Sequence, residues 1–251
     1  MAAARKADRG ASARPRAGEQ TVRHIRTLAA QHRLEQARAI MRPLTDHLAQ
    51  LIELHAANEI VAYSAQLSNQ IPASYAANAF EVFRHAQLNY EIVRLCALWD
   101  SVDLDKRNIP TVIELIDDEA VLDLCREAAC STMQYRGADE AVRQADLARR
   151  WLVDTIAQAR GVLASQELAS TLTLRDRHLA HSLVQSARER KGAVEPMKHG
   201  DETHLLERSQ RIVDALYRTV CDTSFDWDGW WMQARRNARA LWHGCTFVVS
   251  N

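Results

Sequence analysis

The sequence contains few of the residues that interrupt helices. Only eight of its 251 residues are glycine and only five are proline. It also lacks alternating runs of valine, isoleucine and threonine between turn residues, the pattern that marks β-strands. Alanine, leucine, arginine, glutamate and glutamine are abundant instead, and all of these favour helices. We therefore predict an all-α fold.

Net charge is also absent, because 32 lysine and arginine residues balance 32 aspartate and glutamate residues. A neutral protein has no general positive field with which to hold a nucleic-acid duplex regardless of sequence. This balance excludes a protein that coats nucleic acid through its overall charge. Any contact with nucleic acid must come from local basic patches.

Cysteine motifs and long apolar runs are missing as well. The cysteines are odd in number, none belongs to a C-x-x-C pair, and all lie in apolar or alanine-rich surroundings, as free thiols do. No apolar run approaches the roughly twenty residues that span a bilayer, and no secretory apolar region is recognisable. We therefore expect a cytoplasmic protein without membrane contact. The five cysteines are Cys96, Cys125, Cys130, Cys221 and Cys245.

The chain divides into a tail and one predicted domain. Residues 1–20 are a basic tail that we expect to be disordered. Residues 21–251 are expected to form a single all-α domain, with a core at about 45–187 and additional C-terminal helices at about 201–245. Glycine, proline and dense charge mark residues 188–200 as a linker.

Apolar residues at helical spacing give the individual helices. Pro43 is expected to separate the first two of them. The predicted helices cover residues 21–40, 44–68, 74–102, 139–164, 166–187, 201–221 and 225–247, and shorter helices begin at Pro110 and near Asp117.

One short stretch inside the predicted helix 166–187 concentrates charged and titratable side chains. On a regular helix, Arg177 and His181 share one face, and Arg175 and His178 share another. Arg175 and His181 lie about 120° apart around the helix, so they would converge only through an irregular turn or across a two-fold interface. The stretch contains Arg175, Asp176, Arg177, His178 and His181.

The residues just before this stretch can supply such an irregular turn. Ser170, Thr171 and Thr173 can each disturb the helix before Arg175. A break there is expected to place Arg175 near a helix start, where backbone N–H groups also favour phosphate.

Histidine and arginine together suit the cleavage of a phosphodiester without a metal. Histidine titrates near neutral pH and can move a proton to or from a ribose hydroxyl. Arginine offers a permanent charge and a planar set of donors to the phosphate oxygens. The same residues also fit an ordinary solvated helix face held by weak ion pairs. Spacing alone leaves both interpretations open.

Two stretches resemble the AbiU2-like branch of HEPN domains, which is associated with abortive phage infection. The first is LRDRHLAHS at 174–182, which matches the arginine–polar–x(4–6)–histidine signature of HEPN domains. The second is YEIVRLCALWD at 90–100, followed by NIPTVIELI at 108–116. The resemblance implies an up-and-down helical bundle with additional C-terminal helices. It also implies a dimer whose cleft presents the arginine and the histidine to RNA.

From this resemblance we hypothesise a metal-independent endoribonuclease that acts in phage defence or in a toxin–antitoxin system. Arg175, Asp176 and His181 are the candidate catalytic residues: Arg175 stabilises the charged phosphorane, His181 moves the proton, and Asp176 orients one of them. Arg177 and His178 are candidate substrate-binding residues. No metal and no cofactor are expected. The expected partners are RNA, a second copy of the chain, and an antitoxin or other defence protein. The alternative is a non-catalytic helical scaffold or an antitoxin-like binding subunit.

Three further features have alternative interpretations. Tyr90, Arg94 and Asp100 are polar exceptions on an apolar helix, and an internal set of ion pairs and hydrogen bonds is favoured over a catalytic role. His47 and His55 are nearly in line on one helix, but no further metal ligands accompany them. The tryptophan-rich C-terminal helix is either the last core helix or a docking surface for a second subunit.

Overall fold

The computed structural model describes residues 17–248, with gaps at 64, 72, 180–184 and 187. Helices account for 79% of the described residues, and no strand occurs among them, which confirms the predicted all-α fold. Most of the predicted basic tail, residues 1–16, lies outside the described part, and the first helix already begins at Ala17. None of the described helices is long and apolar enough to cross a membrane.

Ten α-helices follow one another along the described chain. They are α1 (Ala17–Thr27), α2 (Ala30–Val61), α3 (Ala65–Gln70), α4 (Tyr75–Ala97), α5 (Ile109–Ile116), α6 (Glu119–Met133), α7 (Ala138–Leu163), α8 (Gln166–Leu174), α9 (Asp201–Cys221) and α10 (Trp227–Trp242). The described chain also contains two 3₁₀ turns, Gln134–Arg136 and Glu189–Lys191. A π-helical turn, Arg175–Leu179, follows α8.

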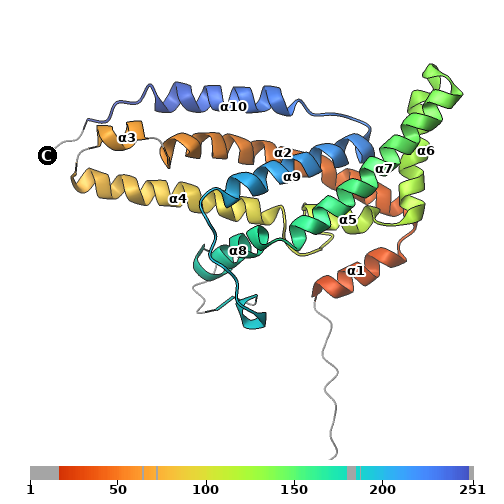
Figure 1. The fold of residues 1–251 in the computed structure, drawn as a ribbon, viewed down its shortest axis with the longest axis horizontal. Helices are drawn as coiled ribbons and strands as arrows, with labels where there is room; N and C mark the ends of the chain where they lie inside the picture. The colour runs from red at the N-terminus through yellow and green to blue at the C-terminus, as the bar shows by residue number, and fades with distance from the viewer. Residues whose placement is uncertain (1–16, 64, 72, 180–184, 187, 249–251) are drawn as a thin grey trace, which may run out of the picture.

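Helix α2 is the centre of the bundle. It packs against α4, α5, α9 and α10. Figure 1 shows that α2, α4, α9 and α10 all extend along the long axis of the molecule. Leu44, Leu48 and Ile52 of α2 are completely buried, and Leu51 is nearly so. These positions repeat at the three- and four-residue spacing that places side chains on one side of a helix. The predicted apolar stripe of this helix is therefore the centre of the hydrophobic core.

The prediction that Pro43 separates two helices is wrong. Pro43 lies inside α2, which continues without interruption from Ala30 to Val61. A proline inside a helix removes one backbone hydrogen bond and costs about 3 kcal/mol. Met41 and Leu44, on either side of it, are fully buried in the core. We infer that burial of this stretch outweighs the local penalty, so packing decides the outcome.

The start of α5 fits the sequence closely. Pro110 lies in the first turn of this helix, as predicted, where its missing N–H costs nothing. Asn108 caps the helix, because its Oδ1 accepts a hydrogen bond of 2.9 Å from the backbone N–H of Thr111. The cap fixes the end of the segment that joins α4 to α5.

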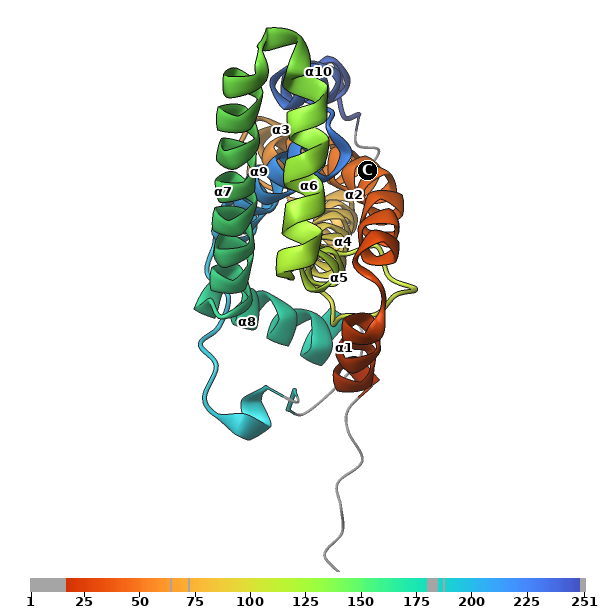
Figure 2. The same ribbon diagram turned by 90° about the vertical axis from the view of Figure 1, so that its right-hand side faces the viewer.

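The predicted helix over residues 166–187 is a regular α-helix only as far as Leu174, directly after the residues that were expected to disturb it. Helix α8 passes into the π-helical turn Arg175–Leu179, and residues 185 and 186 are not helical. Figure 2 shows that α8 turns away from the direction of α7. Residues 180–184 lie outside the described part of the chain. Turns of the π type are rare and frequently occur at functional sites.

The residues before the π-helical turn give a local reason for it. The hydroxyls of Ser170 and Thr171 each donate a hydrogen bond of 2.7 Å to the backbone carbonyl of the fourth residue before them. Bonds of this kind compete with regular helix geometry and bend helices. The expectation that Arg175 lies near a helix start is wrong, because its backbone N–H bonds back into the last turn of α8. The negative end of the helix dipole therefore faces Arg175.

The C-terminal helices belong to the core. Helix α9 contributes the buried Leu205, Val213 and Leu216, and it packs between α2 and α7. Helix α10 lies along α2 and buries Trp227 and Ala234. Of the two alternatives for the tryptophan-rich segment, the structure therefore supports the last core helix.

Candidate functional site

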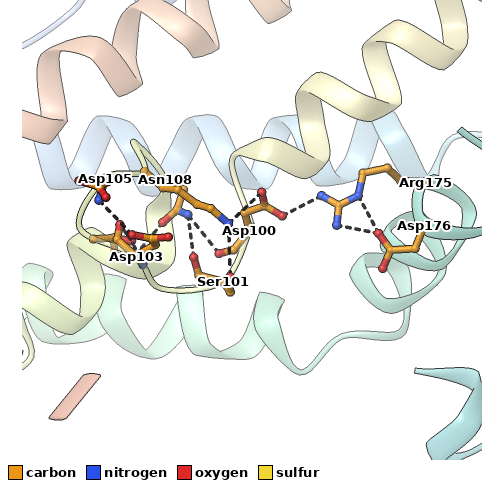
Figure 3. Close-up of polar contacts among 9 residues, drawn as sticks. Asp100, Ser101, Asp103, Asp105, Asn108, Arg175 and Asp176 are labelled. Atoms are coloured by element: carbon orange, nitrogen blue, oxygen red, sulfur yellow. Dashed lines mark hydrogen bonds and ion pairs between the residues drawn. The ribbon is translucent and has the colours of Figure 1, made fainter. Parts of the chain in front are cut away.

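Arg175, at the start of the π-helical turn, is held by two carboxylates. Its Nη1 donates to Oδ1 of Asp100 at 2.8 Å. Its Nε and Nη2 both donate to Oδ1 of Asp176, at 2.9 and 2.8 Å. Figure 3 shows the guanidinium group lying between these two carboxylates, which come from different parts of the chain. The arrangement fixes the plane and direction of the guanidinium group.

Asp100 is fixed in turn by the segment between α4 and α5. The Nζ atom of Lys106 lies 3.5 Å from Oδ2 of Asp100. The side-chain amide of Asn108 donates to the backbone carbonyls of Asp100 and Ser101, both at 3.2 Å (Figure 3). Since Asn108 also caps α5, the segment is tied to the bundle at both ends. Asp100 is therefore a firmly placed partner for Arg175.

The predicted linker 188–200 borders this cluster. Arg188 donates from Nη1 to Oδ2 of Asp176 at 2.7 Å, so Asp176 bridges two arginines. Glu189 accepts a hydrogen bond of 2.8 Å from Nη1 of Arg177. Bonding to the backbone and hydroxyl of Ser186, together with the charge of Arg177, holds the pKa of Glu189 below its usual value.

We call Arg175, Asp100, Asp176, Arg188 and Lys106 the Arg175 cluster. It contains three cations and two carboxylates, so it retains one net positive charge. Burial acts to lower the pKa of Arg175, but the hydrogen bonds to Asp100 and Asp176 raise it above its ordinary value. The guanidinium group therefore stays charged, and those of its N–H groups that do not bond to the carboxylates are left to bind an anion.

The other predicted site residues differ in what the structure describes. Arg177 takes part through its bond to Glu189, and its Nε is buried without a hydrogen-bond partner among the described residues. The backbone of His178 lies in the π-helical turn, but its side chain is outside the described part. His181, the candidate proton donor and acceptor, also lies outside the described residues. The structure thus brings Arg175 and Asp176 together and leaves the position of His181 open.

Tyr90, Arg94 and Asp100 do not form one internal set. Arg94 donates from Nη1 to the hydroxyl of Tyr90 at 3.2 Å and from Nε to His47 Nε2 at 3.1 Å. Its Nη2 donates to Gln50 Oε1 at 3.1 Å, so Arg94 connects α4 to α2. Tyr90 is half exposed. The expected role in helix packing therefore fits Arg94, whereas Asp100 belongs to the Arg175 cluster.

A second polar cluster, which the sequence analysis did not identify, is buried in the core. His55 Nδ1 lies 2.6 Å from Glu91 Oε1, and Asn58 donates to Glu91 Oε2 at 2.6 Å. Burial acts to lower the pKa of His55, but the hydrogen bond and the charge of Glu91 raise it above its ordinary value. Trp231 lies edge-on to the His55 ring, with 5.8 Å between the centroids. The partners come from different helices, so spacing along the sequence could not reveal them.

The two aligned histidines, His47 and His55, therefore have separate partners. His47 accepts from Arg94 and His55 bonds to Glu91. Within the described part of the chain, no group of three or more histidine, cysteine, aspartate or glutamate side chains is arranged to hold a metal ion. Both partners lie on α4, so the alignment of His47 with His55 reflects the packing of α2 against α4.

The model of the AbiU2 family of HEPN domains matches residues 35–241 of the chain. The matched region begins in α2 and ends in α10, so it contains the whole Arg175 cluster and the C-terminal core helices. No match was found among curated proteins or among solved structures.

Proposed function

The chain belongs to the AbiU2 family of HEPN domains, and we propose that it is a metal-independent endoribonuclease of phage defence or of a toxin–antitoxin system. The observation that carries the proposal is the Arg175 cluster. A guanidinium group is held in one orientation, in a cluster that carries one net positive charge, six residues before His181. Preorganised positive donors of this kind stabilise charge that develops in a transition state.

In the proposed reaction the 2′-hydroxyl of a ribose attacks the adjacent phosphorus. The bond from O2′ to phosphorus forms and the bond from phosphorus to O5′ breaks, which leaves a 2′,3′-cyclic phosphate and a free 5′-hydroxyl. His181 accepts the proton of the 2′-hydroxyl or supplies the proton to O5′. Arg175 donates to the non-bridging oxygens, which become most negative in the phosphorane. No metal is needed, because the nucleophile is part of the substrate and already close to the phosphorus.

Asp176 and Asp100 act in this proposal as positioning residues. Both accept hydrogen bonds from Arg175, and Asp176 also accepts one from Arg188. Neither carboxylate needs to touch the substrate, because their effect is to fix the direction of the guanidinium group. Arg177 and His178 are proposed to bind RNA next to the cleaved linkage. For Arg177 this means contact through N–H groups that do not bond to Glu189.

We also propose that the protein acts in the cytoplasm as a homodimer, with an antitoxin or another defence protein as a further partner. Exposed apolar side chains on α4 support the dimer: Tyr75 is 94% and Val82 is 72% exposed. They are seven residues apart and so share one face of the helix. Light scattering at micromolar concentration is expected to give twice the chain mass. A strict monomer there would contradict this part of the proposal.

The competing function is a non-catalytic helical scaffold or an antitoxin-like binding subunit. One observation favours it, because Arg175, Arg177 and Arg188 are each paired with a carboxylate, as in an ion-pair network that only joins α4, α8 and the linker. Under this alternative the cluster stabilises the fold and the protein cleaves nothing. The two functions differ in what purified protein does to RNA.

The test is an RNA-cleavage assay on the purified full chain with EDTA present. We expect cleavage products that end in a 2′,3′-cyclic phosphate and no loss of rate on adding EDTA. Arg175→Ala is expected to lower the rate about 10²–10³-fold, as does the loss of one donor to a developing oxyanion. Arg150→Gln on α7 removes an exposed arginine that has no partner among the described residues, and it should cleave normally. Absence of cleavage by the parent protein would favour the scaffold.

A further inference from the structure

A groove on the surface between α2 and α4 lies beside the segment that carries Asp100. We call it the Arg94 groove, and its volume is about 570 Å³. Arg94 comes from the last turn of α4, and Arg107 from the segment that leads into α5. The groove is lined by Pro43, Asp46, His47, Gln50, Arg94 and Arg107.

Arg94 is held in a different way from the arginines of the Arg175 cluster. Its three described hydrogen bonds go to His47, Tyr90 and Gln50, none of which is a carboxylate. Burial and the nearby charge of Arg94 lower the pKa of His47 to about 4, so His47 is neutral at physiological pH. Arg94 is therefore fixed in position by uncharged side chains, and none of these partners offsets its positive charge.

The charge of the groove favours an anion. Arg94 and Arg107 are cationic, and Asp46 is the carboxylate in the lining. Arg107 is exposed, and among the described residues it makes no hydrogen bond or ion pair. A fixed guanidinium group with a second, free one nearby is a suitable arrangement for phosphate oxygens.

An aromatic ring lies next to these charges. Tyr90 is 51% exposed, and the centroid of its ring lies 5.8 Å from Cζ of Arg94. Proteins that bind single-stranded nucleic acid combine a basic groove for the backbone with aromatic rings on which bases stack. Arg94, Arg107 and Tyr90 supply both components in one place.

The groove is joined to the Arg175 cluster by the segment between α4 and α5. Asp100, near the start of this segment, bonds to Arg175, and Arg107, near its end, lines the groove. The bonds from Asn108 to the carbonyls of Asp100 and Ser101 hold the segment in shape. One short, fixed segment therefore carries both a partner of Arg175 and a residue that lines the groove.

We propose that the Arg94 groove binds single-stranded RNA outside the cleaved linkage, with phosphates on Arg94 and Arg107 and a base on Tyr90. This inference rests on the proposed function, because it assigns to that site a path for the substrate. It adds a binding site that the arginine–histidine signature does not contain.

The test is the binding of a fluorescently labelled RNA oligonucleotide in which every 2′-hydroxyl is methylated, so that it cannot be cleaved. Anisotropy is measured with the full chain over a series of salt concentrations. For a single strand, each phosphate contact contributes about 0.7 to the slope of log affinity against log salt. Arg94→Gln and Arg107→Gln are each expected to lower the slope by about that amount and the affinity about fivefold at 0.1 M salt.

Matched variants separate charge from folding. Arg150→Gln makes the same change in charge on α7 and should bind RNA as the parent protein does. Arg94→Lys keeps the charge and should restore most of the slope. Arg107→Gln removes a side chain without a described partner, so it should leave the unfolding midpoint unchanged.

Equal slopes and affinities for the groove variants and for Arg150→Gln would overturn the inference, as would a parent protein that binds no RNA even at low salt. The two proposals fail separately. A parent protein that cleaves RNA while the groove variants bind normally would overturn the groove alone. A parent protein that binds RNA through the groove but cleaves none would overturn the ribonuclease proposal and support the proposed RNA-binding role of the groove.

Discussion

Asp100 and Arg175 are 75 positions apart in the sequence, yet they meet in an ion pair of 2.8 Å. Asp100 follows the end of α4, and Arg175 begins the π-helical turn after α8. The pair therefore fixes the motif arginine to a different part of the bundle. A second bond partner, Asp176, is the next residue along the chain. The guanidinium group is therefore held by one carboxylate from a distant part of the chain and by one from its own turn.

Replacement of Asp100 tests the role of the long-range pair. Asp100→Asn keeps the size of the side chain but removes the charge that attracts Arg175 and Lys106. We expect kcat for RNA cleavage to fall about tenfold with a small change in KM, because misplacing a catalytic group mainly affects the transition state. The measurement is a comparison of kcat and KM for the variant and the parent protein.

Asp105 offers a control on the same segment. It is exposed and makes a backbone hydrogen bond to the side chain of Asp103, and no described ion pair involves it. Asp105→Asn should leave both kinetic constants unchanged. Equal activity of Asp100→Asn and the parent protein would show that the Asp100–Arg175 pair only stabilises the fold.

The buried His55–Glu91 pair should matter for stability and not for cleavage. Removing the imidazole leaves the carboxylate of Glu91, which is 1% exposed, with Asn58 as its remaining described side-chain partner. Breaking a buried charged pair typically costs about 3–5 kcal/mol. We expect His55→Ala to lower the free energy of unfolding in urea by that amount. Adding Glu91→Gln should recover part of the loss, and a loss below about 1 kcal/mol for His55→Ala would contradict a stabilising role for this buried pair.

His47 should make stability depend on pH below neutrality. Its pKa is about 4 in the folded chain, against 6.5 for an unperturbed histidine. Between these values the unfolded chain binds more protons, so this contribution to stability is present above pH 6.5 and is lost as the pH falls toward 4. In His47→Gln, an acceptor for Arg94 is kept but the titration is removed. The slope of unfolding free energy against pH should therefore be shallower in the variant, by at most one proton per molecule.

Urea unfolding of both proteins at several pH values between 7 and 4 checks this prediction. Other groups titrate in the same range, and the comparison removes them because they are common to both chains. Identical slopes would mean that Arg94 and burial do not perturb His47. A steeper slope of unfolding free energy against pH for the variant would mean that the contribution of His47 has the opposite sign. That result would contradict the assignment of His47 as a neutral acceptor.

Local patterns in the sequence were sufficient for most of the helices. Apolar spacing placed the core of α2 and α9, and Pro110 marked the first turn of α5. These features depend on residues within a few positions of one another. Pro43 shows the limit, because its effect was decided by burial of its neighbours and not by its own helix propensity.

The candidate site was predictable only in part. The stretch around Arg175 stood out by its density of charge, and Ser170 and Thr171 indicated where the helix would become irregular. The role of Asp100 as the partner of Arg175 depends on how α4 and α8 pack, so spacing could not reveal it. The contact between His55 and Glu91, which are 36 positions apart, could not be predicted from the sequence for the same reason.

The most direct test of the ribonuclease proposal compares two histidine variants in one assay. The rate of RNA cleavage, with EDTA present, is measured for the parent protein, His181→Ala and His178→Ala, after circular dichroism has shown that all three are folded. We predict that His181→Ala abolishes cleavage while His178→Ala keeps most of it, and that the products of the parent end in a 2′,3′-cyclic phosphate. Cleavage by His181→Ala at the rate of the parent protein would contradict the proposed mechanism.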